Sequence, residues 1–203
     1  MSEQQYVELL AYESANVFTE RQTQLDLGEA ENSSVSEEAL MALLQSLEFE
    51  NILQYVHIPR HPFSTKANSA TSGDVSDNRT DTGAGAGRQD FKRIFDLLHE
   101  KGVKKIIRLM VDDDEVCPHT DEIIEGLHRF EIEDWEWKKV DISSVVLQKA
   151  AAHAQQVRLW SSGNHSVLRD WSSCDGLKEL KRVRIFQPPG TSYCTNTYDI
   201  SSR

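Results

Sequence analysis

Three short stretches of the chain contain residue types that can do chemistry. RTDTGAGAG at 79–87 contains Asp81-Thr82-Gly83, which matches the sequence motif of a protease's catalytic aspartate turn. DDDE at 112–115 offers carboxylates that suit a divalent cation. SSGNHS at 161–166 combines a histidine with the kind of turn whose free backbone amides bind anions. Whether any of these stretches forms a site depends on the elements that position it.

The Asp81-Thr82-Gly83 stretch lacks the strand that a catalytic aspartate needs. Residues 78–80 supply no apolar run to fix the carboxylate, and the surrounding residues 59–88 are dominated by Ser, Thr, Asn, Asp and Gly. The chain also has no second Asp-Thr-Gly for an aspartic dyad and no serine segment typical of a subtilisin-like triad. This composition predicts a flexible linker over 59–88 and no protease site.

The acidic group Asp112, Asp113, Asp114 and Glu115 is the candidate metal site. It directly follows VKKIIRLMV at 103–111, a predicted strand, and ligands of parallel sheets gather beyond the carboxyl ends of the strands. Two or three of these carboxylates could hold Mg²⁺ for phosphoryl transfer or hydrolysis. The simpler interpretation is a hydrated loop, because no phosphate-binding glycine loop accompanies the acids.

Ser162, Gly163, Asn164 and His165 form the candidate anion or loop site. They lie between a predicted strand at 157–162 and a predicted helix, where free amides can receive an anion and His165 can act as an acid or base. The simpler interpretation is a turn at Gly163-Asn164, with Asn164 or Ser166 capping the helix.

The elements around these stretches predict a small α/β domain. Strands are expected at 52–58, 103–111, 132–140, 157–162 and 182–186, and the later ones recur at intervals of about 22 to 30 residues with helices between them. Such alternation predicts a mostly parallel sheet of four to five strands with right-handed crossovers and flanking helices. Ser34 and Glu37 have capping-box spacing before a helix over 35–48, and Gly102 is placed to end a helix.

Charge and composition divide the chain into four regions. Residues 1–58 hold eleven acidic residues against Arg21 alone, so this acidic, partly helical segment carries −10 of the net charge of −11. The linker follows at 59–88, the α/β domain at 89–187 and a loosely ordered tail at 188–203. The acidic charge disfavours nucleic acid, no apolar run suits a membrane, no secretory signal is evident, and no cofactor motif is present. A cytoplasmic location is expected.

The order of motifs resembles the region that precedes the catalytic domain in fungal intracellular subtilisin-like serine proteases. The resemblance covers about residues 50–187. Four pieces carry it: YVHIP at 55–59, FDLLHEKGVKKIIRL at 95–109, PHTDEIIEGLHRFEIEDWEWKKVDI at 118–142 and LWSSGNHSVLRDWSSCDGLKELKRVRI at 159–185. In that family a protease domain with Asp, His and Ser follows, but this sequence ends sixteen residues after Gln187. No catalytic residue carries over, and the chain resembles a stand-alone or truncated copy of the accessory region.

Two functions are therefore expected from the sequence. The first is a non-catalytic accessory module that binds protein, with a protease domain encoded elsewhere as one candidate partner. The alternative is a small metal-assisted phosphotransferase or hydrolase that uses Asp112 to Glu115. The sequence identifies neither the partner nor the oligomeric state.

Overall fold

The computed structural model describes residues 21–28, 36–61, 88–180, 182–186 and 198–199. These residues build one seven-stranded sheet whose strands lie in the order in which they occur along the chain. The first six strands are parallel to one another, and the short last strand is antiparallel to the sixth. The predicted α/β class with a mostly parallel sheet is confirmed, with more strands than expected.

The strands are β1 (Gln24–Asp26), β2 (Ile52–Ile58), β3 (Lys105–Val111), β4 (Glu131–Val140), β5 (Gln156–Trp160), β6 (Val183–Phe186) and β7 (Tyr198–Asp199). The helices that connect the parallel strands are α2 (Glu37–Ser46), α3 (Asp90–Glu100), α4 (Asp121–Glu125), α5 (Ser144–Ala150) and α6 (His165–Ser172). Two 3-10 turns, η3 (Gly126–Arg129) and η4 (Leu177–Glu179), extend these crossovers.

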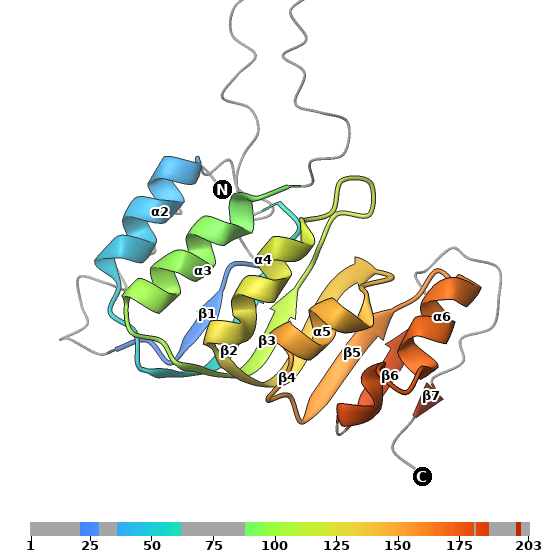
Figure 1. Ribbon diagram of the computed structural model, residues 1–203. Coiled ribbons are helices and arrows are strands. Elements are labelled where there is room, and N and C mark those ends of the chain that lie inside the picture. The colour runs from blue at the N-terminus through green and yellow to red at the C-terminus, as the bar shows by residue number, and fades with distance from the viewer. Residues whose placement is uncertain (1–20, 29–35, 62–87, 181, 187–197, 200–203) are drawn as a thin grey trace, which may run out of the picture.

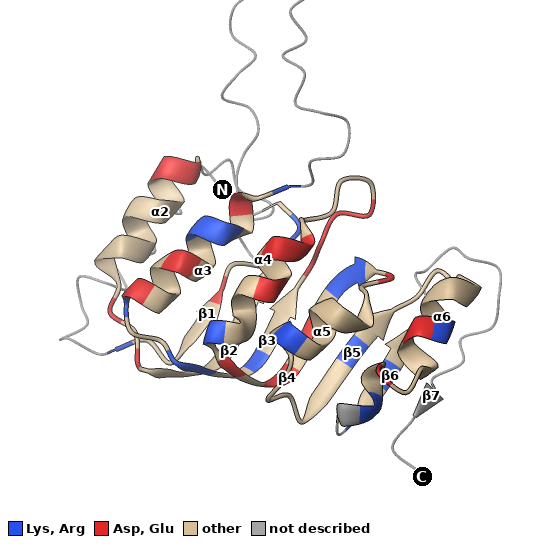
Figure 2. Ribbon diagram, viewed as in Figure 1, with Lys and Arg blue, Asp and Glu red and all other residues tan. Residues whose placement is uncertain are grey.

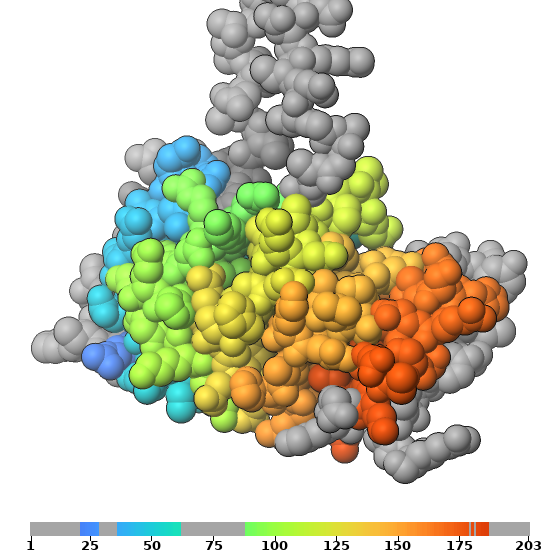
Figure 3. All heavy atoms as spheres, viewed as in Figure 1, coloured from blue at the N-terminus to red at the C-terminus, as the bar shows by residue number. Residues whose placement is uncertain are grey.

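All five helices lie on the same side of the sheet (Figure 1). This follows from the strand order, because a right-handed crossover between neighbouring parallel strands always returns on the same face when the order never reverses. Viewed from that side, the helices form a continuous layer in front of the strands (Figure 3). The molecule therefore has two layers, with helices on one face of the sheet and none of the described helices on the other.

The core lies between the helices and the sheet. One row of paired residues crosses all six parallel strands on this side: Leu25, Val56, Leu109, Trp135, Val157 and Val183. Each of these side chains is at most 5% exposed. The helices bury matching apolar faces, such as Phe91, Ile94, Phe95 and Leu98 on α3. Branched and aromatic side chains on both layers thus exclude water from the sheet's helix side.

The structure places residues 21–28 and 36–58 within the α/β domain rather than in a separate acidic segment. β2 lies between β1 and β3, and α2 packs on α3 as part of the same helix layer. Leu53, Val56 and Ile58 of β2 have no exposed surface. The last part of the acidic region therefore supplies an interior strand of the sheet. Most of the predicted linker, including Asp81, lies outside the described residues, as do residues 1–20 and all of the predicted tail except β7.

The helix ends follow the predicted local chemistry with one correction. α2 is capped by Ser36, whose hydroxyl accepts a hydrogen bond from the Ala39 amide at 3.2 Å, rather than by Ser34. Gly102 follows α3 with a φ of 87°, the left-handed conformation that glycine tolerates best. This residue turns the chain from the helix into β3.

Candidate functional site

The four carboxylates of the acidic loop after β3 point to four different partners. The loop begins at Asp112, whose backbone amide still bonds to the Ile58 carbonyl at the end of β2. The Asp112 side chain lies on the sheet face away from the helices, 3.4 Å from His57 Nε2 and 2.7 Å from Lys138 Nζ. Burial opposes ionisation, but the bonds from His57 and Lys138 together lower the pKa of Asp112.

Asp113 points to the opposite face and is buried beneath the helices. Its Oδ1 is 2.8 Å from His119 Nδ1, and its Oδ2 accepts a hydrogen bond from Trp137 Nε1 at 2.7 Å. The second nitrogen of His119, Nε2, is 2.8 Å from Asp90 Oδ1 at the start of α3. The His119 ring also stacks on Phe91, with the ring centroids 3.7 Å apart.

This Asp113–His119–Asp90 chain is a buried charge cluster. Burial disfavours the imidazolium, yet the hydrogen bonds to Asp113 and Asp90 outweigh it and raise the pKa of His119. Burial likewise opposes ionisation of Asp90, but the bonds from His119 and Arg88 lower the pKa of Asp90 to about 2. The side chain of His119 has no exposed surface. The cluster therefore joins β3, β4 and α3, with His119 and Asp113 shielded from solvent and Asp90 partly exposed.

Asp114 and Glu115 complete the loop without joining their neighbours. Asp114 Oδ1 accepts hydrogen bonds from the amides of Val116 and Cys117 at 2.8 and 2.9 Å, which closes a tight turn. Its other oxygen lies 3.3 Å from His61 Nε2. Glu115 is exposed and 4.0 Å from Arg60. Three successive aspartates thus each contact a histidine from a different segment.

The diverging carboxylates leave the metal alternative without a ligand set in the described part of the chain. No group of three or more His, Cys, Asp or Glu side chains is arranged there to hold a metal ion. Asp112 and Asp113 face opposite sides of the sheet, so they cannot share a cation. The loop instead connects the ends of β2, β3 and β4 through ion pairs.

Ser162, Gly163, Asn164 and His165 do lie together between β5 and α6, but the amides of Ser162, Gly163 and Asn164 already have acceptors. The Ser162 amide bonds to Asp141 Oδ1 at 2.9 Å, and the Gly163 amide bonds to Ser161 Oγ at 3.0 Å. Asn164 Oδ1 accepts from the Ser166 amide at 2.9 Å and so caps α6. The turn-and-cap interpretation accounts for these contacts, and the Asp141 carboxylate occupies the position that an anion would need.

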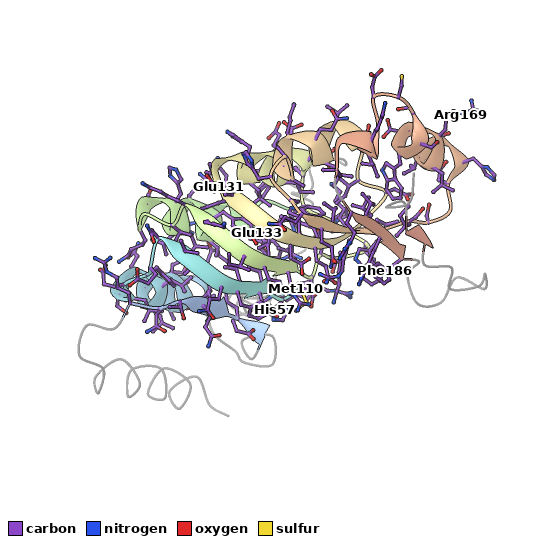
Figure 4. The ribbon with its side chains drawn as sticks, turned by 90° about the horizontal axis from the view of Figure 1, so that it is seen from below. His57, Met110, Glu131, Glu133, Arg169 and Phe186 are labelled. Carbon is purple, nitrogen blue, oxygen red and sulfur yellow. The ribbon has the colours of Figure 1, made fainter. Side chains whose placement is uncertain are left out.

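The surface that sequence reasoning missed is the sheet face opposite the helices, which we call the helix-free face. Its central row pairs Asp26, His57, Met110, Glu136, Arg158 and Arg184 across the six parallel strands. Tyr55, Arg108 and Asp134 form the row before it. Beyond it lie the paired residues Trp160 and Phe186 and the ion pair of Asp112 with Lys138. Figure 4 shows His57, Met110 and Phe186 on this side and Arg169 on the helix side. No described element covers this face.

Ion pairs run across the helix-free face from strand to strand. Arg158 Nη1 lies 2.8 Å from Asp134 and 3.2 Å from Glu136. His57 Nδ1 lies 2.9 Å from Asp26, and its hydrogen bond to Asp112 is the largest of the effects that raise the pKa of His57. Trp160 and Phe186 stack with ring centroids 5.3 Å apart at the β5–β6 end. The face therefore combines a largely paired set of charges with half-buried aromatic and thioether side chains.

One sequence signal could have revealed this face. Along β5 and β6 every second residue is apolar and buried, while Arg158, Trp160, Arg184 and Phe186 between them are only half-buried. Strands of a parallel sheet covered on both faces are apolar almost throughout. The alternation therefore indicated a sheet with a single helix layer. Of the other tryptophans, Trp135, Trp137 and Trp171 are buried as expected for core residues.

Comparison of the chain with models of protein families, with curated proteins and with solved structures found no match in any of the three. The resemblance to the region upstream of fungal subtilisin-like protease domains stays a prediction from sequence motifs. Within the described ranges, no helix combines the length and apolar character that crossing a bilayer requires. Function must therefore be argued from the surface itself.

Proposed function

We propose that this chain is a non-catalytic protein-binding module and that the helix-free face of its sheet binds the partner. The observation that carries the proposal is a six-stranded parallel arrangement with helices on one side and no described element on the other. Parallel sheets are almost always covered on both faces. A protein surface that docks there would supply the second cover.

The composition of the helix-free face supports a protein partner. Aromatic residues, Met and Arg are enriched at protein interfaces, and they also supply most of the residues that dominate binding energy. The face carries Tyr55, Trp160, Phe186 and Met110 together with three arginines, Arg108, Arg158 and Arg184. Because most of its charges are already paired, a partner can desolvate them at lower cost than isolated charges.

The buried acid-base cluster Asp113–His119–Asp90 is better suited to stabilising the fold than to a reaction, because its histidine has no exposed surface. The resemblance adds a candidate partner, a subtilisin-like protease domain encoded elsewhere. The chain's net charge of −11 disfavours nucleic acid as the ligand.

Affinity capture with matched surface variants tests this proposal. Proteins captured from the native cell by the full chain are purified and their affinity is measured directly against wild type, Met110→Glu and Val145→Glu. Met110 lies on the helix-free face, whereas Val145 is 56% exposed on α5 in the helix layer. We expect Met110→Glu to weaken binding at least about tenfold by placing an unpaired charge in the interface, and Val145→Glu to leave it unchanged.

Three outcomes would contradict the proposal. The first is a partner lost with Val145→Glu but retained with Met110→Glu, since it would place the interface on the helices. The second is digestion of casein by the purified chain. The third is turnover of generic ester or phosphate substrates. Circular dichroism of each variant confirms that the sheet is intact before binding is compared.

A further inference from the structure

We propose that residues 1–20 of this chain dock on the helix-free face, over the β5–β6 end, and compete there with the partner. The inference rests on the proposed function, because it assigns a second occupant to the same face. Three observations support it: a basic surface on β5 and β6, the charge of residues 1–20, and the distance that they must span.

The β5–β6 end of the face is basic in an acidic protein. Neither Gln156–Trp160 nor Val183–Phe186 contains an acidic residue, whereas Arg158, Arg184 and the preceding Arg182 are cationic. Figure 2 shows blue segments on β5 and β6. Arg158 is paired with carboxylates of β4. Among the described side chains, no carboxylate lies within ion-pair distance of Arg182 or Arg184.

Apolar surface lies beside these cations. Trp160 and Phe186 occupy the positions two residues after Arg158 and Arg184 on the same face, and their rings stack at 5.3 Å. Both side chains are only half-buried, and none of the described elements lies over them. A matching ligand therefore carries carboxylates next to aromatic or aliphatic side chains.

Residues 1–20 have that chemistry. They contain Glu3, Glu8, Glu13 and Glu20 and no lysine or arginine. Apolar residues lie between these glutamates, among them Tyr6, Leu9, Leu10, Tyr12, Val17 and Phe18. Opposite charge next to complementary apolar surface favours this segment over the rest of the acidic chain as the occupant.

The segment is long enough to reach its target. It joins the sheet at Arg21, directly before Gln22, which bridges to Phe49 at the start of β1. Five interstrand spacings separate β1 from β6, a distance of about 24 Å. Twenty residues span about 30 Å as a helix and up to about 70 Å when extended. The β5–β6 end is therefore within reach whichever conformation the segment adopts.

Site-specific photo-crosslinking in the full chain tests the inference. A benzophenone amino acid is placed at Met110 on the helix-free face, or at Val145 on α5 as the control, and crosslinked peptides are identified by mass spectrometry. We expect Met110 to crosslink to peptides from residues 1–20 and Val145 not to. Mixing isotope-labelled and unlabelled protein separates crosslinks within one chain from those between two copies.

Charge variants then test the pairing itself. We expect Arg184→Glu to reduce the Met110 crosslink about fivefold, the scale of one lost exposed ion pair plus a new repulsion. Adding Glu8→Lys and Glu13→Lys to Arg184→Glu should restore the yield. Asp199 of β7 lies opposite Arg184 in the backbone register, so Arg184→Glu alone could also act through β7. Recovery in the combined variant separates the two causes. Loss of yield in Arg184→Glu without recovery in the combined variant would overturn the pairing.

The outcomes separate this inference from the proposed function. Crosslinks from Met110 to a captured partner but never to residues 1–20 would overturn the inference and leave the proposed function standing. Equal crosslinking from Met110 and Val145 would also overturn it, and crosslinks found only between labelled and unlabelled copies would replace it with self-association. If the inference holds, neutralising the four glutamates to glutamine should strengthen partner binding, because a competitor is weakened.

Discussion

Asp112 and Asp113 are neighbours in the chain, yet their side chains serve opposite faces of the sheet. Successive residues of a strand alternate in direction, and the loop continues that alternation for two more residues beyond β3. Asp112 meets His57 and Lys138 on the helix-free face, while Asp113 meets His119 and Trp137 under the helices. Two adjacent carboxylates therefore stabilise two separate layers, which explains why they do not form one ligand group.

Among the polar residues, His119 is expected to contribute strongly to stability. Replacing His119 with Ala leaves the buried Asp113 carboxylate without its cationic partner and opens a cavity beside Phe91. We expect the free energy of unfolding to fall by about 3–5 kcal/mol, the cost of breaking a buried ion pair by removing one partner. Urea unfolding measures it. The exposed His153→Ala variant is the control and should change stability by less than about 0.5 kcal/mol.

The same cluster predicts how stability depends on pH. The pKa of His119 is raised above 6.5, so its stabilising contribution is complete below pH 6.5 and is lost as pH rises through the folded-state value. The pKa of Asp90 is lowered from 3.8 to about 2, so its contribution is present above pH 3.8 and is lost as pH falls toward 2.

The difference in unfolding free energy between wild type and His119→Ala should therefore be largest between about pH 4 and 6.5. Urea titrations at a series of pH values measure it. A difference that is constant from pH 3 to 9, or that grows in alkali, would show that His119 acts through packing alone.

At the scale of single elements, two glycines at helix ends offer a matched comparison. Gly102 follows α3 at φ 87°, and Gly126 follows α4 at φ −58°; a Cβ would meet no atom within 4 Å at either position. Gly102→Ala should lower the free energy of unfolding by about 1 kcal/mol, because the alanine is strained in the left-handed conformation and makes no new contact. Gly126→Ala should be neutral or stabilise by up to about 1 kcal/mol. Thermal unfolding that ranked the two variants in the reverse order would contradict this account.

Most elements were predictable because their residues show a clear pattern. The strand at 52–58 was predicted with the bounds of β2, and 132–140 differs from β4 by one residue at its start. β1 was missed because it has three residues, of which Leu25 alone is buried, so no periodicity can appear. Thr120 precedes α4 at the position of a cap, but its side chain makes no capping bond.

The two histidine–aspartate clusters could not be predicted from the sequence, for a different reason. The Asp113–His119–Asp90 chain joins residues up to 29 positions apart, and His57 contacts Asp112 across 55 positions. Neither spacing has a recognisable pattern, because the contacts depend on which strands become neighbours. The residues that meet on the helix-free face likewise depend on strand order, although the alternation along β5 and β6 indicates that one sheet face lacks helices.

At the scale of the whole molecule, the position of β2 sets the smallest unit that can fold. The region 89–187, which the sequence suggests as the domain, lacks β1, α2 and β2. Without β2, the edge of β3 loses its partner and the buried face of α3 loses Leu40 and Leu44 of α2. An exposed, apolar parallel edge of this kind promotes aggregation.

A fragment that begins at Gln89 should therefore fail to fold. Gel filtration should find it aggregated, and urea should unfold it without a cooperative transition, whereas the full chain should be well behaved in both measurements. A monomeric fragment with a cooperative transition would show that residues 21–58 are dispensable.

The sequential strand order has a mechanical consequence. Each strand is bonded only to its neighbours in the chain, and β1 and β6 lie five strands apart across the sheet. A pulling force applied between them loads the strand pairs one after another instead of shearing them all together. We expect such a molecule to yield at low force in successive steps, in the manner of a zipper, so tension would expose its interior gradually rather than in one rupture.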